Sequence, residues 1–145
     1  MNKLETKVHL VNDKVRFSGT ARNVPAVFMD YFPPIGDGEG YTGLEMLLLS
    51  LSGCSSTAIK VLLQKMNKTV EGLSVEASGI RQEKAPYSFS SIELAFTLKS
   101  PDASPEDLEK AIRLAETSMC PVWALIRGNV EIIVKSKVTR GSEHP

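Results

Sequence analysis

The chain is poor in the residues that most often build metal and redox sites. Its 145 residues include two cysteines, two histidines and one tryptophan. His9 and His144 have no partner at metal-ligand spacing, and Cys54 and Cys120 form no CxxC pair. This pattern excludes a tetrahedral zinc signature and a thioredoxin motif, and it disfavours a Cys-His hydrolase pair. We therefore expect neither a metal nor a bound cofactor.

An excess of charge of either sign is also absent. Lysine and arginine number 17, aspartate and glutamate number 17, and the formal net charge is zero. Because phosphate binding would leave a basic excess on some face, nucleic acid is not an expected partner. The most apolar stretch, Leu44 to Cys54, contains Glu45 and two serines and is shorter than the roughly 20 residues of a membrane span. We expect a soluble protein with a small-molecule partner and no membrane partner.

The N-terminal sequence MNKLETKVHLVNDK lacks the apolar region of a signal peptide, which predicts that the chain has no leader. Two cysteines without an export signal predict a reducing, cytoplasmic location, in which a permanent disulfide is not expected. A hydrophobic content of 42% is enough to build one core at this length. We expect a single domain over residues 1–140 and a disordered tail over 141–145.

Alternating apolar residues predict that the chain begins with β-strands. Val8 and Leu10, then Val15 and Phe17, flank an Asn-Asp turn, and a further extended piece covers 26–31. Residues 33–40 contain two prolines and three glycines, so they form a loop. This loop is either a plain connector or a flexible rim over a pocket.

A long helix is predicted over residues 43–66. Apolar residues recur there at spacings of three and four, namely Leu47, Leu51, Cys54, Ala58, Leu62 and Met66. Its first half is apolar nearly all round, which is typical of a helix surrounded by protein. The remaining elements of one chain can scarcely cover such a helix, so we expect a homodimer in which two of these helices are buried together.

The second half of the chain predicts a hairpin, two helices and a last strand. Strands are expected around 73–77 and 92–98 with a turn at 82–87, and a final strand over 130–138 carries Ile132 and Val134 inward. Strands and helices are segregated along the chain, which predicts an α+β fold.

Between these strands, Ser104 and Pro105 open a helix. The apolar stripe of that helix consists of Leu108, Ile112, Ala115 and Met119. A short helix starts at Pro121.

Each cysteine can be interpreted either as a reactive thiol or as an inert structural residue. Cys54 lies in the middle of the long helix, where a free cysteine can be simply a small buried hydrophobe. The adjacent Gly53 costs a helix about 1 kcal/mol against alanine, which indicates a close approach by a ligand or a partner helix. Cys120 is predicted at the N-cap of the short helix, where backbone N–H groups would lower the pKa of a thiol; alternatively it marks an incidental helix break. If the two thiols meet, one can capture a sulfenic acid on the other.

Together these segments resemble the OsmC/Ohr family, named for osmotically inducible protein C and organic hydroperoxide resistance protein. The resemblance covers essentially the whole chain and rests on GLEMLLLSLSGCSSTAIKVLLQK in the long helix and on the later CPVWALIRGN. The amino-acid sequences of these motifs are closer to those of the OsmC-like branch. The resemblance implies β-sheets wrapped around a long central helix in an interlocked homodimer. It also implies thiol-dependent reduction of organic hydroperoxides in oxidative stress defence.

By this resemblance, Cys54 is the peroxidatic cysteine and Cys120 the resolving cysteine. Peroxidases of the family also use an N-terminal arginine to hold the thiolate, and a glutamate just before the central helix to hold the arginine. Arg22 and Arg16 compete for the first role, and Arg22 is favoured. Glu45 is the nearest glutamate, although nine helical steps place it on the face opposite Cys54. A dithiol reductant, of lipoyl type in the peroxidase branch, is the implied partner.

Two other functions stay open. One is a catalytically weak OsmC-like dimer that binds an apolar small ligand at its interface and keeps this pocket when both cysteines are replaced by serine. The other is a hotdog-type thioesterase, which would need a carboxylate on the long helix, where Glu45 is the sole acid. For the peroxidase, the candidate apolar lining would favour alkyl or lipid hydroperoxides over hydrogen peroxide, and it consists of Phe28, Phe32, Met46, Leu51 and Trp123.

Overall fold

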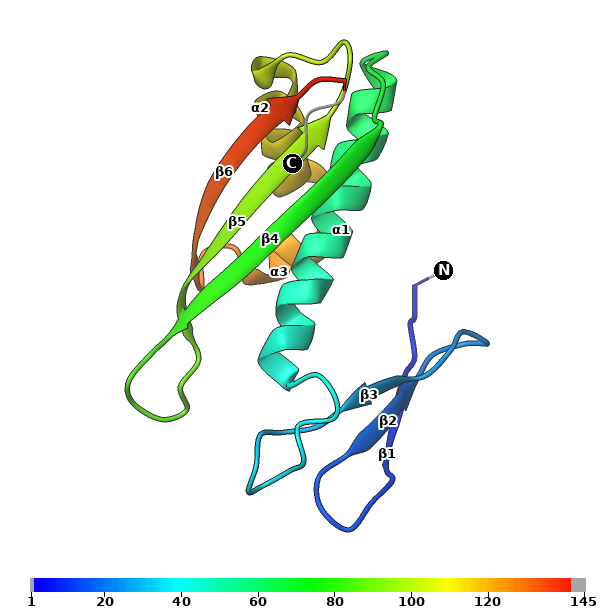
Figure 1. The fold of residues 1–145 in the computed structure, drawn as a ribbon, viewed down its shortest axis with the longest axis vertical. Helices are drawn as coiled ribbons and strands as arrows, with labels where there is room; N and C mark the ends of the chain where they lie inside the picture. The colour runs from blue at the N-terminus through cyan, green and yellow to red at the C-terminus, as the bar shows by residue number, and fades with distance from the viewer. Residues whose placement is uncertain (1, 142–145) are drawn as a thin grey trace. The chain divides into compact units, whose positions relative to one another are not determined.

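The structure, a computed structural model, describes residues 2–141. It divides into two compact units, Met1–Leu47 and Leu48–Pro145, which are described separately below (Figure 1). Residues 142–145 of the predicted tail, His144 among them, lie outside the described residues. Strands and helices are segregated as predicted, so the α+β fold class is confirmed.

The first unit contains a three-stranded antiparallel sheet. Its strands β1 (Lys7–Leu10), β2 (Phe17–Thr20) and β3 (Val27–Met29) lie side by side in chain order. Leu10 pairs with Phe17, which in turn pairs with Met29. The predicted strands are therefore present, except that Val15 lies in a bend before β2. Several apolar side chains of this small sheet are exposed, namely Val8, Leu10, Val27 and Phe28.

The long helix α1 runs over Gly43–Lys65, close to the predicted bounds. Its start is fixed by a capping box, in which the Thr42 N–H donates to Glu45 Oε1 at 2.9 Å and the Glu45 N–H donates to Thr42 Oγ1 at 3.3 Å. Its end is marked by Asn67, whose φ of 60° reverses the chain. The capping pair explains why the loop of residues 33–40 gives way to a helix at Gly43.

One face of α1 is buried and another is open. The buried residues are Leu51, Ser55, Ala58, Ile59 and Leu63. Cys54 is half-buried beside this face, whereas Leu49 is 51% exposed. By length and composition alone, α1 is long and apolar enough to cross a membrane. The same test is passed by core helices of α+β proteins, and the buried face of α1 agrees with that role.

The second unit is built on a sheet of strands β4 (Gly72–Arg81), β5 (Phe89–Lys99) and β6 (Glu131–Thr139). β4 and β5 form the predicted antiparallel hairpin, and β6 pairs with β5 in parallel. A parallel neighbour requires a crossover connection, which the helices between β5 and β6 supply. The central strand directs one row of side chains into the core, Ile92, Leu94, Phe96 and Leu98, each at most 1% exposed.

The outer strand β6 is less buried than predicted. Ile132 is half-buried, but Val134 is classed with the exposed residues, so its predicted inward burial is wrong. β6 lies at the edge of the sheet and has one neighbouring strand, β5. An edge strand buries less of each side chain than a central one.

The crossover consists of α2 (Pro105–Leu114), a π-helical turn η1 (Ala115–Met119) and α3 (Pro121–Ile126). The predicted cap of α2 is confirmed, since the Asp107 N–H donates to Ser104 Oγ at 3.1 Å. The predicted apolar stripe is confirmed up to Ala115 and wrong at Met119, which is 42% exposed while Cys120 is 2% exposed. The π-helical turn adds one residue, and this insertion moves the inward position from Met119 to Cys120.

Candidate functional site

Cys120 is the N-cap of α3, as its position before Pro121 predicts. Its backbone is extended, with φ −91° and ψ 107°, and the Trp123 N–H donates to its sulfur at 3.4 Å. The Ala124 N–H bonds to the Cys120 carbonyl at 3.1 Å. The cysteine therefore takes the place that serine or aspartate usually fills at a helix start.

The pKa of the Cys120 thiol is raised, contrary to the expectation from its N-cap position. Burial is the largest cause, because it disfavours the thiolate. Backbone N–H groups of Trp123 and Val122 act in the expected direction and lower the pKa, but less strongly. The neighbouring Cys54 thiol raises the pKa further. The expected net lowering is thus wrong, because the helix start is inside the protein rather than at its surface.

The structure brings the two cysteines together. Cys54 is close enough to raise the pKa of the Cys120 thiol, so the two cysteines are neighbours. Both are free thiols, Cys54 half-buried and Cys120 buried. The pair joins the middle of α1 to the start of α3, two segments far apart in the sequence.

The helix surface next to Cys54 is open on one side. A Cβ atom at Gly53 would meet no atom within 4 Å, and Gly53 itself is exposed. Among the described residues, then, nothing makes the close approach that a glycine in this helix predicts. A second molecule remains the alternative that the sequence indicated.

Arg22, the favoured arginine, lies in an exposed turn of the first unit. Its φ of 55° is in the left-handed region, which few residues other than glycine, asparagine and aspartate adopt readily. Within residues 2–141 its guanidinium group forms no ion pair. The turn leaves the side chain free of any carboxylate in this part of the structure.

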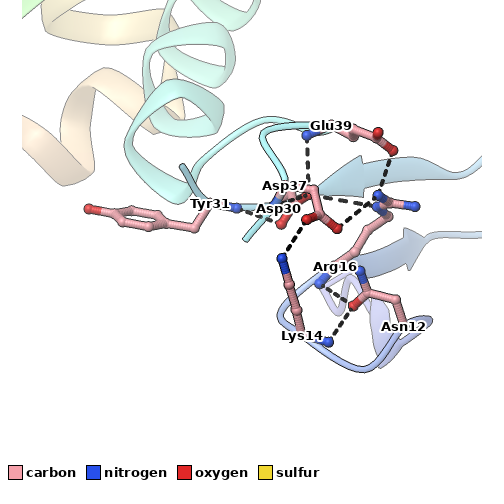
Figure 2. A network of polar contacts seen from close by, with 7 residues as sticks. All are labelled: Asn12, Lys14, Arg16, Asp30, Tyr31, Asp37 and Glu39. Atoms are coloured by element: carbon pink, nitrogen blue, oxygen red, sulfur yellow. Dashed lines mark hydrogen bonds and ion pairs between the residues drawn. The ribbon is translucent and has the colours of Figure 1, made fainter. Parts of the chain in front are cut away.

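Arg16, the competing arginine, is held by three carboxylates of the same unit (Figure 2). Its Nη2 atom lies 2.5 Å from Glu39 Oε2 and 3.6 Å from Asp37 Oδ2, and its Nε atom lies 3.7 Å from Asp30 Oδ2. Asp37 also accepts a hydrogen bond from Lys14 at 2.7 Å. The Arg16 side chain is only about a quarter exposed, at 26%. Arg16 thus has the carboxylate partners that Arg22 lacks.

Asp30, a residue that the sequence did not single out, organises this network (Figure 2). Its buried carboxylate accepts backbone N–H groups from Tyr31 at 2.8 Å, Glu39 at 3.1 Å and Asp37 at 3.3 Å. Burial by itself would raise the pKa of Asp30, but these hydrogen bonds and the charge of Arg16 outweigh it and lower the pKa. The loop of residues 33–40 is therefore folded around a buried charge.

Two glycines of that loop allow the close packing. A Cβ atom at Gly36 would overlap the Asp30 carboxylate and the Tyr31 carbonyl oxygen, and one at Gly40 would lie 2.8 Å from the Phe28 carbonyl oxygen. The ends of the loop are tied together, since the Asp30 N–H donates to the Tyr41 carbonyl at 3.1 Å. The sequence feature that could have indicated this arrangement is Asp30, an aspartate just before the Gly- and Pro-rich loop of residues 33–40.

The same loop borders a cavity of about 640 Å³ in the first unit. Aromatic side chains dominate its lining, which includes Phe28, Tyr31, Phe32 and Tyr41 together with Glu39 and Glu45. Phe28 and Phe32 line this cavity, the other three candidates, Met46, Leu51 and Trp123, do not, and the loop forms part of its rim. The Glu45 carboxylate also accepts the Thr42 N–H in the capping box, so this group stabilises the helix start.

The comparisons with known proteins agree on one family. A model of the family described as OsmC-like protein matches residues 36–135. Protein YhfA of Escherichia coli strain K12 is 29% identical over 89 residues, which make up 61% of this chain and 66% of that protein. The chain therefore spans about two thirds of the length of this relative.

Solved structures show the same fold over nearly the whole chain. A hypothetical protein from Aquifex aeolicus VF5 superimposes with a TM-score of 0.85 at 21% identity, covering 98% of this chain and 100% of that one. An organic hydroperoxide resistance protein from Elizabethkingia anophelis gives a TM-score of 0.70 at 18% identity, covering 96% and 98%. The family model and the shared fold lead to one conclusion: the chain belongs to the OsmC-like protein family.

Proposed function

We propose that the protein is a cysteine-based peroxidase that reduces organic hydroperoxides, with Cys54 peroxidatic and Cys120 resolving. The observation that carries this proposal is the placement of two free thiols as neighbours, a half-buried Cys54 on α1 and a buried Cys120 at the start of α3. Family neighbours named organic hydroperoxide resistance proteins support the same chemistry. We place this activity in the cytoplasm, where a reducing environment keeps both thiols free between turnovers.

The division of roles follows from exposure and charge. Cys54 is half-buried and Cys120 buried, so a hydroperoxide reaches Cys54 first. The raised pKa of Cys120 keeps that thiol protonated and a poor nucleophile. In the first step, the Cys54 thiolate attacks the distal oxygen of the hydroperoxide, the O–O bond breaks, and the alkoxide leaves and takes up a proton. Cys54 is oxidised to a sulfenic acid, and the hydroperoxide is reduced to an alcohol.

The second step closes a disulfide. The Cys120 sulfur attacks the sulfur of the Cys54 sulfenic acid, the S–O bond breaks, and water leaves with the proton of the Cys120 thiol. Oxidation of Cys54 removes the thiolate charge that raises the pKa of Cys120, so the resolving thiol becomes more acidic at the moment it is needed. An external dithiol, for which a lipoyl group is the proposed type, then reduces the disulfide by thiol exchange.

A cation is also needed to stabilise the thiolate and the departing alkoxide. We propose Arg16 for this role in place of Arg22. Arg16 pairs with Glu39, which lies four residues before α1 begins at Gly43. This is the place at which the family resemblance implies a glutamate that holds the arginine. Glu45 lies inside the helix, and its carboxylate already caps Thr42.

The working form is proposed to be a homodimer in which α1 of each chain is covered by the other. Leu49 is 51% exposed, and one turn later Gly53 has open space around it. An apolar residue and a glycine on one exposed helix face suit the close approach of a second helix. Solution mass as a function of concentration tests this assembly.

The cavity in the first unit favours one second candidate, a dimer that binds an apolar small molecule without turnover. Its aromatic lining and volume of about 640 Å³ are in the range of small-molecule sites. Binding of an apolar fluorescent probe should then survive replacement of both cysteines by serine. In the peroxidase proposal, Leu51 and Trp123, which belong to the same unit as Cys54, are the apolar residues that favour alkyl over inorganic hydroperoxides.

The test is a thiol map after one turnover. Reduced protein, freed of reductant, receives one equivalent of cumene hydroperoxide or hydrogen peroxide, and remaining thiols are alkylated and counted by intact mass. We expect both thiols to be lost to one intramolecular disulfide, faster with cumene hydroperoxide. Cys54→Ser should leave Cys120 unreacted, whereas Cys120→Ser should accumulate a sulfenic acid at Cys54. If both thiols stay fully alkylatable in the wild type, the peroxidase proposal is wrong.

A further inference from the structure

The inward position of Cys120 depends on the π-helical turn η1. Along an α-helix the residue after Ala115 on the same face would be Met119, four positions later. In the structure Met119 is exposed, and Cys120, five positions later, is buried. The Cys120 N–H accordingly bonds to the Ala115 carbonyl at 2.9 Å, the five-residue spacing of a π-helix. If this turn tightened to an α-turn, Cys120 would rotate away from Cys54.

The π-helical turn leaves one carbonyl without a backbone donor. In the same five-residue pattern, the Glu116 carbonyl would accept a hydrogen bond from the backbone N–H of residue 121. Residue 121 is a proline, which has no backbone N–H. The Cys120 N–H, its alternative donor, bonds to Ala115. A carbonyl that lacks its partner costs free energy unless another donor reaches it.

Arg127 supplies that donor. Its Nη1 atom donates to the Glu116 carbonyl at 2.7 Å, a short, charge-assisted hydrogen bond across 11 residues. The backbone of Arg127 also belongs to the end of α3, since its N–H bonds to the Trp123 carbonyl at 2.8 Å. The next residue, Gly128, has a φ of 88° and turns the chain toward β6.

The two ends of the Cys120 segment are therefore joined by one side chain. Arg127 is fixed to α3, of which Cys120 is the N-cap, and its guanidinium group reaches the turn that precedes Cys120. The contact is exposed, so water would replace the lost donor, but the bond that ties η1 to the end of α3 would be gone.

We propose that Arg127 is a positioning residue that holds the resolving thiol of Cys120 against Cys54. The expected effect on the rate of disulfide closure rests on the proposed peroxidase function. The inference adds to that function by naming the residue that sets this rate. The printed hydrogen bonds of Arg127 go to Glu116 and Trp123, in η1 and α3, so its loss should affect closure by Cys120 and leave the attack of Cys54 on the hydroperoxide unchanged.

Three variants test this role. Arg127→Met keeps the length of the side chain and removes its donors, and Arg127→Lys restores a charged donor. Arg113→Met is the matched control, because Arg113 is an exposed arginine near the end of α2 whose side chain forms no ion pair among residues 2–141. Circular dichroism and thermal unfolding establish that each variant is folded at the assay temperature.

Two readouts are needed. The first adds one equivalent of cumene hydroperoxide and separates Cys54 sulfenic acid, trapped with a cyclic 1,3-diketone, from the closed disulfide. The second needs no hydroperoxide: the Cys54–Cys120 dithiol is equilibrated with oxidised and reduced dithiothreitol, and the fraction of protein disulfide is measured. Both report how well the two thiols are held together.

In Arg127→Met we expect oxidation of Cys54 at the wild-type rate and disulfide closure slowed about tenfold, the effect of one charge-assisted hydrogen bond. The equilibrium constant for the protein disulfide should fall by a similar factor. Arg127→Lys should recover most of both losses, and Arg113→Met should match the wild type. Equal closure rates and equal equilibrium constants in Arg127→Met and Arg113→Met would overturn the proposal. If wild-type Cys54 is not oxidised at all, the peroxidase function fails, and the dithiothreitol equilibrium alone decides the role of Arg127.

Discussion

The thiol of Cys54, half-buried on α1, raises the pKa of the buried thiol of Cys120. Part of the shift comes from burial and part from Cys54, so Cys54→Ala should lower the pKa of Cys120 without returning it to its ordinary value. The pH dependence of Cys120 alkylation by iodoacetamide, followed by peptide mass, measures this change.

Ser56→Ala serves as the control for this prediction, because Ser56 lies on the same helix two residues from Cys54. Its alkylation midpoint should equal that of the wild type. A midpoint that stays unchanged or rises in Cys54→Ala would mean that burial alone sets the pKa of Cys120 and that the two thiols do not interact.

Asp30 should make the first unit sensitive to acid. Its pKa is lowered in the folded state, so its contribution to stability is complete above its unfolded value of 3.8 and is lost as the pH falls below that value. In Asp30→Asn an amide NH₂ group would face backbone donors, and one acceptor oxygen would be lost. We expect lower stability than wild type near neutral pH and a smaller difference at pH values well below 3.8, measured by urea unfolding.

The exposed Asp13, in the neighbouring turn, provides the matched substitution. Asp13→Asn removes the same charge without touching the loop of residues 33–40, and it should leave stability near the wild-type value at both pH values. Equal behaviour of the two asparagine variants would show that the buried carboxylate does not organise the loop.

Gly36 and Gly19, both in the first unit, provide a second test variant and its matched control. A Cβ atom at Gly36 would overlap the Asp30 carboxylate and the Tyr31 carbonyl, whereas one at Gly19 would meet Val27 at an ordinary 3.5 Å. Gly36→Ala should therefore cost about 1–3 kcal/mol of unfolding free energy. Gly19→Ala should stay within about 0.5 kcal/mol of the wild type. Comparable losses in both, measured by urea unfolding, would contradict the close packing around Asp30.

The sequence predicted most helices and strands correctly, but it predicted only part of the candidate site. Capping and periodicity are local, so Ser104, Pro105 and the bounds of α1 could be located directly. The π-helical turn could not, because nothing in the sequence near Ala115 separates a five-residue turn from a four-residue one. Its consequence was the misplaced inward position at Met119.

The electrostatic predictions depended on burial, which a single sequence does not reveal. Cys120 was correctly placed at a helix start, but the sign of its pKa shift depends on how much protein covers that start. Asp30 was missed for a related reason. Two of its three backbone donors, Asp37 and Glu39, come from the loop of residues 33–40, which could equally be a simple connector.

The exposed part of α1 should form the dimer contact. Leu49→Lys places a charge on that face, and we expect it to weaken dimerisation on the order of a hundredfold or more, since each of two copies loses the burial of one leucine. Leu125→Lys is the control, because Leu125 is 83% exposed on α3. Sedimentation velocity over a range of concentrations distinguishes the two. A wild type that is monomeric throughout, or a Leu49→Lys variant that dimerises normally, would remove α1 from the interface.

The rate of Cys54 oxidation can decide whether Arg16 or Arg22 stabilises the thiolate. Arg16 has Glu39 at 2.5 Å and is only about a quarter exposed, while Arg22 lies in an exposed turn. If Arg16 stabilises the thiolate and the departing alkoxide, Arg16→Met should slow the oxidation of Cys54 by cumene hydroperoxide about a hundredfold. Arg22→Met should leave that rate within about twofold, the small effect expected of an exposed side chain outside the reacting groups.

Loss of Arg16 also leaves the carboxylates of Asp30, Asp37 and Glu39 facing one another, so instability must be separated from chemistry. Lys14→Met breaks the ion pair with Asp37 and adds repulsion to the same cluster while keeping Arg16 in place. Rates are compared at a temperature at which all variants are folded. A slow Arg16→Met beside a fast Lys14→Met assigns the cation to Arg16. The reverse pattern, with Arg22→Met slow and Arg16→Met fast, returns the role to Arg22, and the acidic cluster around Arg16 is then a scaffold for the loop that borders the cavity.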